Sequence, residues 1–264
     1  MLSATQALVG LSRSRIDTGL PRMLAFAPMH AEVTIPVYNE ENDLPKCIQT
    51  LTKFLEAEKA LDVSIVIADN ASTDRTWELA QELAKQYANV KALHIPQKGR
   101  GLALRTVWSQ SKADIVSYMD VDLSTNLKFY PLLIHGISVY YDMAVGSRLM
   151  QASRIKRSLK REVLSRGYNT MIKMTFWNRF SDAQCGFKAI RRDVMLKLLP
   201  HIKNNNWFFD CEMMLLAEKH GFKIFEVPVE WIDDLDSRAR IGPSIIEHSQ
   251  GLLRMRLAGF SQQL

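Results

Sequence analysis

The chain has few cysteines and lacks a long apolar run. Its three cysteines are Cys47, Cys185 and Cys211, and none belongs to a Cys-x-x-Cys pair. Neither a disulfide framework nor a zinc site is therefore expected, and the composition suits a reducing compartment such as the cytoplasm. No uninterrupted apolar stretch reaches the roughly 18 residues that a membrane span needs. Internal repeats, low-complexity tracts and linkers are also missing, which favours one folded domain.

Acidic residues are outnumbered, because 34 Lys and Arg stand against 28 Asp and Glu, a formal net charge of +6. This balance suits anionic partners such as nucleotide phosphates or lipid headgroups, although a soluble enzyme without such a partner can be equally basic. Nucleic acid is not an expected partner. The basic residues are not interleaved with an aromatic stacking platform, and the signature of a nucleic-acid-binding module is missing.

The two ends of the chain differ from its middle. Residues 1–30 contain several arginines but no sustained apolar block like that of a secretory signal. We expect them to form a poorly ordered or weakly amphipathic extension, followed by one domain over residues 31–240. Residues 241–264 are expected to form an amphipathic helix that either packs on the domain or lies in a membrane interface. Its expected apolar face consists of Ile246, Leu253, Leu257, Phe260 and Leu264.

Apolar runs alternate with helical patterns through the first half of the chain. Residues 33–37, 63–68, 90–95 and 114–119 have the composition of buried strands. This alternation predicts an α/β fold, with a mostly parallel central sheet flanked by helices and joined by right-handed crossovers. The second half is less regular. Strands are expected at 142–146 and at 222–231, where Pro228 interrupts the run, and helices at 160–177 and 211–220.

Two carboxylates follow the strand expected at 114–119. Asp120 and Asp122 stand two residues apart at its carboxyl end, where ligands bind in open α/β sheets. Such a pair can hold one hard divalent cation, Mg²⁺ or Mn²⁺, with positions left for substrate phosphates. The pattern therefore suggests a metal-bridged diphosphate such as that of a nucleotide-sugar, although the same two acids also occur on solvated turns.

Four segments in order carry a family resemblance. They are Pro36-Val37-Tyr38-Asn39-Glu40, Asp69-Asn70-Ala71-Ser72-Thr73-Asp74, Lys98-Gly99-Arg100-Gly101 and Asp120-Val121-Asp122. The series resembles glycosyltransferase family 2, whose members have the Rossmann-like GT-A fold, and it extends over residues 33–236. The implied fold is therefore a single α/β GT-A domain.

Further segments narrow the resemblance to the polyprenyl- and dolichyl-phosphate sugar synthases. Segments 146–148, 160–166, 181–188 and 225–229 resemble the mannose and glucose synthases of that group. Segments 119–125, 207–210 and 233–238 are similar to its actinobacterial members.

The resemblance implies a nucleotide-sugar pocket. Pro36, Tyr38 and Glu40 would line the base and ribose, and Asp69 would hydrogen-bond the base beside Asn70. Without the resemblance, Asp69 and Asn70 would also be explained as a turn or a helix cap.

The diphosphate side of that pocket involves further residues. Lys98 and Gly99 would let the backbone approach the nucleotide, although they also fit a simple basic turn. Arg238 lies in a segment that resembles a loop closing over the donor, where it would touch the diphosphate together with Asp120. Asp210 and Glu212 are expected either to serve the sugar or to cap a helix.

The resemblance assigns the metal to Asp120 and Asp122. The mannose synthases have a glutamine as a further ligand two residues after the second acid, and here that position is Ser124. A hydroxyl is a shorter and weaker ligand, so water is expected to complete the coordination shell of Mg²⁺ or Mn²⁺.

The acceptor side is implied to hold a phosphate. Arg148, Arg161 and Ser165 match positions that bind the acceptor phosphate in the mannose synthases, and a guanidinium suits that role. The alternative for both arginines is a solvated surface charge. Asp182 is assigned to the catalytic group with Arg148 and Arg161. It would orient Lys188 or an arginine, with base catalysis a minor role because a phosphate acceptor is already ionised near pH 7.

The implied function is transfer of a hexose, with inversion, from UDP-glucose or GDP-mannose to polyprenyl or dolichyl phosphate. The implied location is the cytoplasmic face of a membrane, as a peripheral protein with a membrane-protein partner or a second copy of itself. One alternative is a family 2 transferase that acts on a sugar or protein hydroxyl with Asp182 as base. The other is a non-catalytic, membrane-associated relative.

Overall fold

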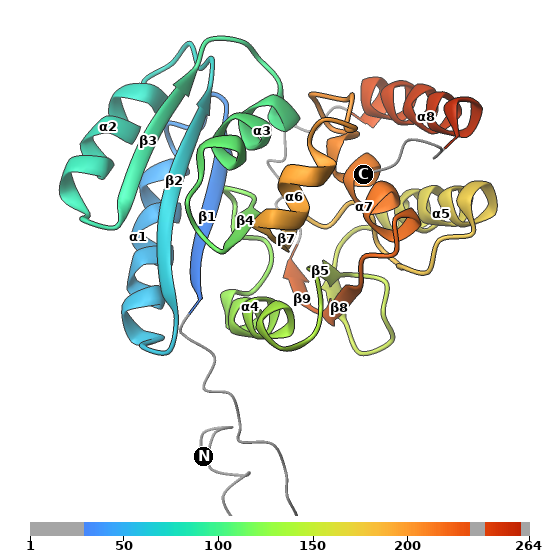
Figure 1. Ribbon diagram of the computed structural model, residues 1–264. Helices are drawn as coiled ribbons and strands as arrows, with labels where there is room; N and C mark the ends of the chain where they lie inside the picture. Colours follow the sequence, from blue (N-terminus) through green and yellow to red (C-terminus); the bar gives the residue numbers. More distant parts are fainter. Residues whose placement is uncertain (1–28, 233–240, 260–264) are drawn as a thin grey trace, which may run out of the picture.

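The computed structural model describes residues 29–232 and 241–259 (Figure 1). Its first half alternates strands and helices as expected from the sequence. The elements are β1 (His30–Val37), α1 (Leu44–Ala57), β2 (Asp62–Asn70), α2 (Thr76–Gln86), β3 (Val90–Ile95), α3 (Arg100–Gln110) and β4 (Ile115–Met119). Pro45 stands in the first turn of α1, where its missing N–H costs no hydrogen bond.

The second half contains shorter elements. They are a 3₁₀ turn η2 (Leu127–Phe129), α4 (Tyr130–Val139), β5 (Met143–Ser147), β6 (Arg154–Lys156), α5 (Leu159–Phe176), β7 (Phe187–Arg191), α6 (Arg192–Leu198), α7 (Phe209–Lys219), β8 (Ile224–Pro228), β9 (Glu230–Ile232) and α8 (Ile241–Ala258). The helices α4 and α6, the turn η2 and the strands β6 and β7 are additions to the elements predicted from the sequence.

The main sheet has seven strands in the order β3-β2-β1-β4-β7-β5-β8. All neighbouring strands are parallel except β7, which runs antiparallel to both β4 and β5. The expectation of an α/β fold with a mostly parallel sheet is therefore confirmed. The strand expected over 222–231 is interrupted at Pro228, as predicted, but its two parts belong to different sheets. The first part is β8, in the main sheet, and the second is β9, which pairs with β6 in a separate two-stranded sheet.

Each face of the main sheet is covered by its own apolar cluster. One cluster joins the sheet to α1, α2 and α4, and the other joins it to α3, α5, α6, α7 and α8. Figure 1 shows α1 and α2 on the side of β1–β3 that lies opposite α3. On the α3 side, the fully buried Trp108 donates its indole N–H to Thr34 on β1 over 3.1 Å. The two clusters fix the sheet, so the carboxyl ends of β1, β2 and β4 form one rigid edge.

The C-terminal helix α8 packs on the domain, which is one of its two expected arrangements. Leu252 and Met255 are buried, and Gly251 is in close contact with Phe208, leaving no space for a side chain. The predicted apolar face instead points to solvent, with Ile246, Leu253 and Leu257 each at least 60% exposed. Phe260 and Leu264 of that face lie outside the described residues, as do residues 1–28. Over the described part of the chain, each helix is too short or too polar to cross a membrane.

Candidate active site

The end of β4 carries the two acids singled out in the sequence. Asp120 follows the strand directly, with its side chain 45% exposed, and Asp122 is exposed and accepts a hydrogen bond from the Ser124 N–H at 2.9 Å. Both line a narrow pocket together with Ser124, Gly186 and Trp231. A Cβ atom at Gly186 would overlap the Asp120 carboxylate, so glycine is required for the acid to turn into this pocket.

The donor set of this pocket fits a divalent cation bound with its substrate. Two carboxylates supply hard oxygen ligands at the end of one strand. Among the described residues, no group of three or more His, Cys, Asp or Glu side chains is arranged to hold a metal ion. Asp120 and Asp122 alone would therefore leave most coordination positions to diphosphate oxygens and water, as is usual for Mg²⁺.

Arg100 joins the metal-side acid to a second, buried acid. Its guanidinium donates to Asp120 Oδ1 at 2.7 Å and to Asp210 Oδ2 at 3.0 Å, and its side chain is 9% exposed. The ring centroids of Tyr118 and Trp207 lie 4.8 and 5.1 Å from the guanidinium carbon. Burial alone would lower the pKa of Arg100, but the carboxylates of Asp210 and Asp120 raise it well above its usual value. Arg100 is therefore a fixed cation beside the expected diphosphate.

Asp210 is held in a buried network at the start of α7. Its Oδ2 accepts from the Tyr118 hydroxyl at 2.5 Å and lies 3.5 Å from the Lys188 ammonium, and Lys188 also donates to Tyr118 at 3.0 Å. Burial favours the neutral acid, but Lys188 and Arg100 outweigh it and lower the pKa of Asp210. Lys188 is thus paired with Asp210. Of the two partners considered for Asp182, Lys188 or an arginine, the structure has the arginine, Arg148.

Glu212, the other acid considered at this helix, lies apart from the network. It accepts from the Asn204 N–H and from Arg254, each at 2.8 Å. It ties α7 to α8 and does not take part in this cluster.

The ends of β1 and β2 form the expected nucleotide side. Asp69 is completely buried, and its Oδ2 lies 2.6 Å from His94 Nδ1, while Oδ1 is buried with no hydrogen-bond partner in the described part of the chain. An orphaned acceptor of this kind is costly unless a ligand donor satisfies it. The N–H groups of a nucleotide base are such donors. His94 itself packs against Trp77, with ring centroids 5.2 Å apart.

Asn70 and Lys98 shape the next part of this edge. Asn70 Oδ1 accepts from the Gly99 N–H at 2.7 Å, so Asn70 positions the loop that begins α3. A side chain at Gly99 would meet the Asn205 carbonyl oxygen at 2.7 Å from its Cβ. The Lys98 ammonium lies 3.4 Å from the centroid of the Tyr38 ring. The loop is therefore anchored to β1 and β2 from two sides.

The loop after β1 is hydrogen-bonded to the start of α2 and the residues before it. Asn39, in the left-handed region at φ 56°, donates its N–H to Ser72 Oγ at 3.0 Å, and the Glu40 N–H donates to Thr76 Oγ1 at 2.8 Å. Pro36 lies in β1, opposite Ala68 of β2. These bonds hold Pro36, Tyr38 and Glu40 at the same sheet edge as Asp69.

Arg148 and Asp182 form a buried pair on the other side of β7. Arg148 donates to Asp182 through Nε at 2.8 Å and Nη2 at 3.0 Å, and its backbone N–H adds a third bond at 3.0 Å. Burial would raise the pKa of Asp182, but the charge and hydrogen bonds of Arg148 lower it to about 2. A carboxylate held this way is a poor proton acceptor at neutral pH. Its role is to orient Arg148.

Arg161 and Ser165 lie one turn apart on α5. Ser165 Oγ is buried without a partner in residues 29–232 and 241–259. The next residue along that face, Asn169, donates to the Ser165 carbonyl at 2.9 Å and accepts from the Ala183 N–H at 2.9 Å. This bond brings the Ser165 turn next to the Asp182 loop. Arg238 lies outside the described residues.

Comparison with known proteins decides the family. The family model described as glycosyl transferase family 2 matches residues 32–199. The chain belongs to glycosyltransferase family 2.

Relatives and solved structures agree with this membership. The family 2 chain is 32% identical over 240 residues to glycosyltransferase AglD of Haloferax volcanii, covering 89% of this chain but 38% of AglD. It is 27% identical over 246 residues to the dolichyl-phosphate beta-glucosyltransferase of Saccharomyces cerevisiae, covering 86% of this chain and 74% of that protein.

The fold is shared with solved structures of lower sequence identity. Glucosyl-3-phosphoglycerate synthase from Mycobacterium tuberculosis, solved with UDP, is 17% identical, covers 87% of this chain and 79% of its own, and gives a TM-score of 0.62. Mannosyltransferase PcManGT from Pyrobaculum calidifontis, solved with GDP-Man and Mn²⁺, is 14% identical. The match covers 88% of this chain and 64% of PcManGT and gives a TM-score of 0.56. The GT-A fold expected from the sequence is confirmed.

Several residues of the site were missing from the sequence prediction. Arg100, Lys188 and Gly186 were noticed as members of motifs but given no contact with Asp120 or Asp210, and Tyr118 was regarded as part of a buried strand. His94 and Trp77 were interpreted as strand and helix residues. The only local signal for His94 is a polar ring near the end of a strand.

Proposed function

We propose that this chain is a metal-dependent inverting transferase that moves glucose from UDP-glucose to polyprenyl or dolichyl phosphate. The observation that carries the proposal is the acceptor side of the site. There, a largely buried Arg148 is fixed by Asp182, whose pKa is about 2, so within the described residues this side offers a fixed cation and Asp182 is not a ready base. A phosphate oxygen needs no deprotonation near pH 7, whereas a hydroxyl does. Relatives named dolichyl-phosphate beta-glucosyltransferases support the same acceptor and the choice of glucose.

Residues on one side of β7 bind the donor in this proposal, and residues on the other side bind the acceptor. On the donor side, Asp69 accepts from the base, and Tyr38, Glu40, Lys98 and the Asn70-bound Gly99 loop surround the nucleotide. On the acceptor side, Arg148, Arg161 and Ser165 hold the lipid phosphate. Its oxygen attacks the anomeric carbon from the face opposite the nucleotide, which inverts the configuration.

Charge that grows on the departing diphosphate is stabilised at the end of β4. Arg100 is a preorganised cation there, and such fixed charges are effective because they need little reorganisation during the reaction. Mg²⁺ or Mn²⁺ held by Asp120 and Asp122 would neutralise diphosphate charge at the same place. Arg238, which lies outside the described residues, is proposed to touch the diphosphate as well.

A donor screen tests this proposal. Purified protein is incubated with radiolabelled UDP-glucose, GDP-mannose, UDP-galactose or UDP-N-acetylglucosamine, a short polyprenyl phosphate and Mn²⁺, and the organic phase is counted. Label from UDP-glucose is expected, and its loss in Asp120→Asn with retention in the surface variant Lys91→Gln would tie it to the site. Label from GDP-mannose alone would show that the transferred sugar is mannose and not glucose. Label from none of the four donors would reject the lipid-phosphate acceptor.

The same proposal places the protein on the cytoplasmic face of a membrane as a peripheral enzyme. The acceptor is a lipid, and the three cysteines are buried and unpaired. A membrane-protein partner or a second copy of this chain remains part of the proposal, and cross-linking followed by mass spectrometry in the native membrane would test it.

A further inference from the structure

The net charge of the chain is concentrated in one segment. Residues 156–179 contain seven Lys or Arg and one acid. Because the whole chain has 34 basic and 28 acidic residues, the rest carries 27 of each sign and is neutral. The single acid, Glu162, is already bonded to Arg157 and Arg166, each at 2.5 Å. This basic segment is α5 with its two flanks.

The same helix exposes a stripe of large apolar side chains. Leu159, Val163, Met174 and Trp177 are 85%, 68%, 75% and 83% exposed. At about 100° per residue, Leu159, Val163 and Met174 fall within roughly 60° of helix circumference. Trp177 is the residue that ends the helix, in the left-handed region at φ 55°. The buried residues of α5, such as Ile172 and Phe176, lie on the opposite side. The stripe is therefore a second apolar face that the domain leaves uncovered.

Basic residues flank this stripe on both sides. By the same helical geometry, Lys160 lies along one edge, and Arg166 and Lys173 lie along the other. All three are exposed. An apolar face bordered by cations is the arrangement of helices that lie in the headgroup region of anionic membranes.

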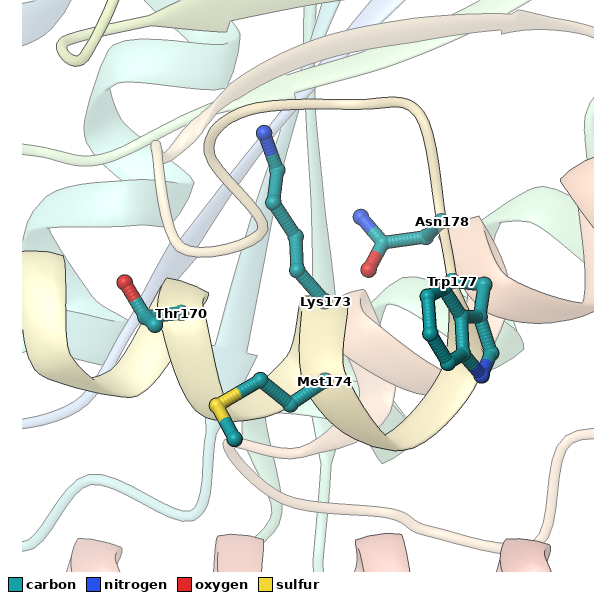
Figure 2. A pocket seen from close by; sticks show the side chains of 5 residues that line it. All are labelled: Thr170, Lys173, Met174, Trp177 and Asn178. Carbon is teal, nitrogen blue, oxygen red and sulfur yellow. The ribbon is translucent and has the colours of Figure 1, made fainter.

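The end of the stripe is hollowed. A hollow of about 440 Å³ is lined by Thr170, Lys173, Met174, Trp177 and Asn178. Figure 2 shows that these side chains come from the last turns of α5 and the residues that follow it. Exposed Trp is typical of the membrane–water interface, where its ring meets both apolar chains and water. The hollow has the size and lining to accept part of a lipid chain.

The helix α8 extends the surface. It lies beside α5, and His248 Nδ1 lies 2.6 Å from the Tyr168 hydroxyl (Figure 1). Its exposed Ile246, Leu253 and Leu257 add apolar area near α5.

We propose that the outer face of α5, Leu159 to Trp177, is the surface by which the protein binds an anionic lipid bilayer. The purpose of this surface rests on the proposed lipid acceptor, because Arg161 and Ser165 lie on the inner side of the same helix. Membrane binding by this face would bring the lipid phosphate to those residues. The test below needs no turnover, so its outcome is separate from that of the donor screen.

Vesicle sedimentation tests the surface. Protein is mixed with vesicles of phosphatidylcholine alone or with about one third phosphatidylglycerol, at low and high salt. Binding to the anionic vesicles is expected, with weakening at high salt because screening shortens the range of the attraction. Lys160→Glu/Lys173→Glu is expected to weaken binding by on the order of thirtyfold or more, since each basic residue near the surface contributes about a factor of five. The matched control Lys53→Glu/Lys85→Glu makes the same charge change on α1 and α2.

A second pair of variants tests the apolar stripe. Val163→Ser/Met174→Ser is expected to reduce binding, whereas Leu132→Ser/Val139→Ser, which changes exposed apolar residues of α4, is not. In addition, Met174→Cys can be labelled with an environment-sensitive dye because the three native cysteines are buried. A blue shift on adding anionic vesicles, missing for Val139→Cys, is expected.

Three outcomes would overturn the proposal. In the first, the control pairs reduce vesicle binding as much as the test pairs do. In the second, the protein does not bind vesicles at all. In the third, the dye at position 174 shows no shift. If light scattering instead shows a dimer that Val163→Ser/Met174→Ser dissociates, the face belongs to a second copy of the chain. Circular dichroism of each variant shows whether it remains folded, and the dye measurement keeps the test valid if a double variant does not.

Discussion

Gly186 is a single residue on which the orientation of Asp120 depends. A Cβ at this position would occupy the space of the Asp120 carboxylate. Gly186→Ala is expected to turn the acid away and to lower activity on the order of 10–100-fold, with a higher Mn²⁺ concentration needed for half-maximal rate. Gly167→Ala is the matched control, because its Cβ would meet nothing within 4 Å. Equal Mn²⁺ dependence in both variants would contradict this assignment.

Asp210 acts on the site through Arg100. Asp210→Asn removes one of the two carboxylates that hold the guanidinium and leaves Lys188 without its counter-ion. Breaking such a buried pair costs roughly 3–5 kcal/mol of unfolding free energy, which denaturant titration would measure. The Mn²⁺ concentration needed for half-maximal rate is expected to rise as well. Arg100, the partner of Asp120, is then no longer held in place by Asp210.

A double variant separates these two effects. Asp210→Asn/Lys188→Met removes the orphaned ammonium and is expected to recover much of the stability while the Mn²⁺ requirement stays high. If recovered stability also restored the Mn²⁺ dependence of the wild type, Asp210 would have a structural role only.

Residues adjacent in the sequence were the predictable part of the site. Asp120 and Asp122 follow one strand, so their proximity needs only the local chain. The bond between Arg100 and Asp210 joins positions 110 residues apart. It depends on how α3 and α7 pack on the same face of the sheet, which no local pattern contains.

At the scale of elements, the inner face of α5 carries the Ser165 hydroxyl, which is proposed to bind the acceptor phosphate. Ser165 Oγ is buried and has no partner within the described residues. Ser165→Ala should therefore leave the melting temperature unchanged or raise it slightly, because it removes an unsatisfied polar atom. The KM for polyprenyl phosphate is expected to rise about tenfold, as for loss of a hydrogen bond to a charged group.

A hydroxyl elsewhere on α5 provides the control for this prediction. Thr175→Ala removes the hydroxyl that donates to the Met171 carbonyl at 2.8 Å and should leave the acceptor KM unchanged. A similar KM in both variants would remove Ser165 from the acceptor site.

Long periodic elements were predicted well and short ones poorly. The helix expected at 160–177 is α5 within one residue at each end. The strand β7 has five residues, and its Phe-Lys-Ala-Ile-Arg sequence contains a lysine that becomes completely buried. A buried lysine is recognisable only once its partners, Asp210 and Tyr118, are in place, so the sequence pattern alone does not identify this strand.

For the whole molecule, the Arg148–Asp182 pair predicts a dependence of stability on pH. The pKa of Asp182 is lowered from 3.8 to about 2 in the folded state. The pair therefore contributes about 2 kcal/mol above pH 4, and this contribution is lost as pH falls from about 4 to about 2. Denaturant midpoints of wild type and Asp182→Asn, compared between pH 5 and pH 2.5, should converge. In the exposed-acid variant Asp62→Asn, the denaturant midpoint should change with pH in parallel with that of the wild type.

The pH dependence of turnover gives a separate check on the same residue. Because its pKa is about 2, Asp182 should produce no change of kcat/KM between pH 5 and 8. A limb in that range that disappears in Asp182→Asn would indicate a base and would favour a hydroxyl acceptor.

The antiparallel strand β7 makes the two substrate sites depend on one pairing register. Side chains alternate along a strand, so Lys188 reaches the Asp210 side while Phe187 and Ala189 join the opposite cluster. A slip of one residue would exchange these faces. It would bury Phe187 in the charge network and carry Gly186 away from Asp120 and Asp182 away from Arg148. A misfolded copy of this kind would lose donor and acceptor binding together, so partly active, mispaired forms are not expected to accumulate.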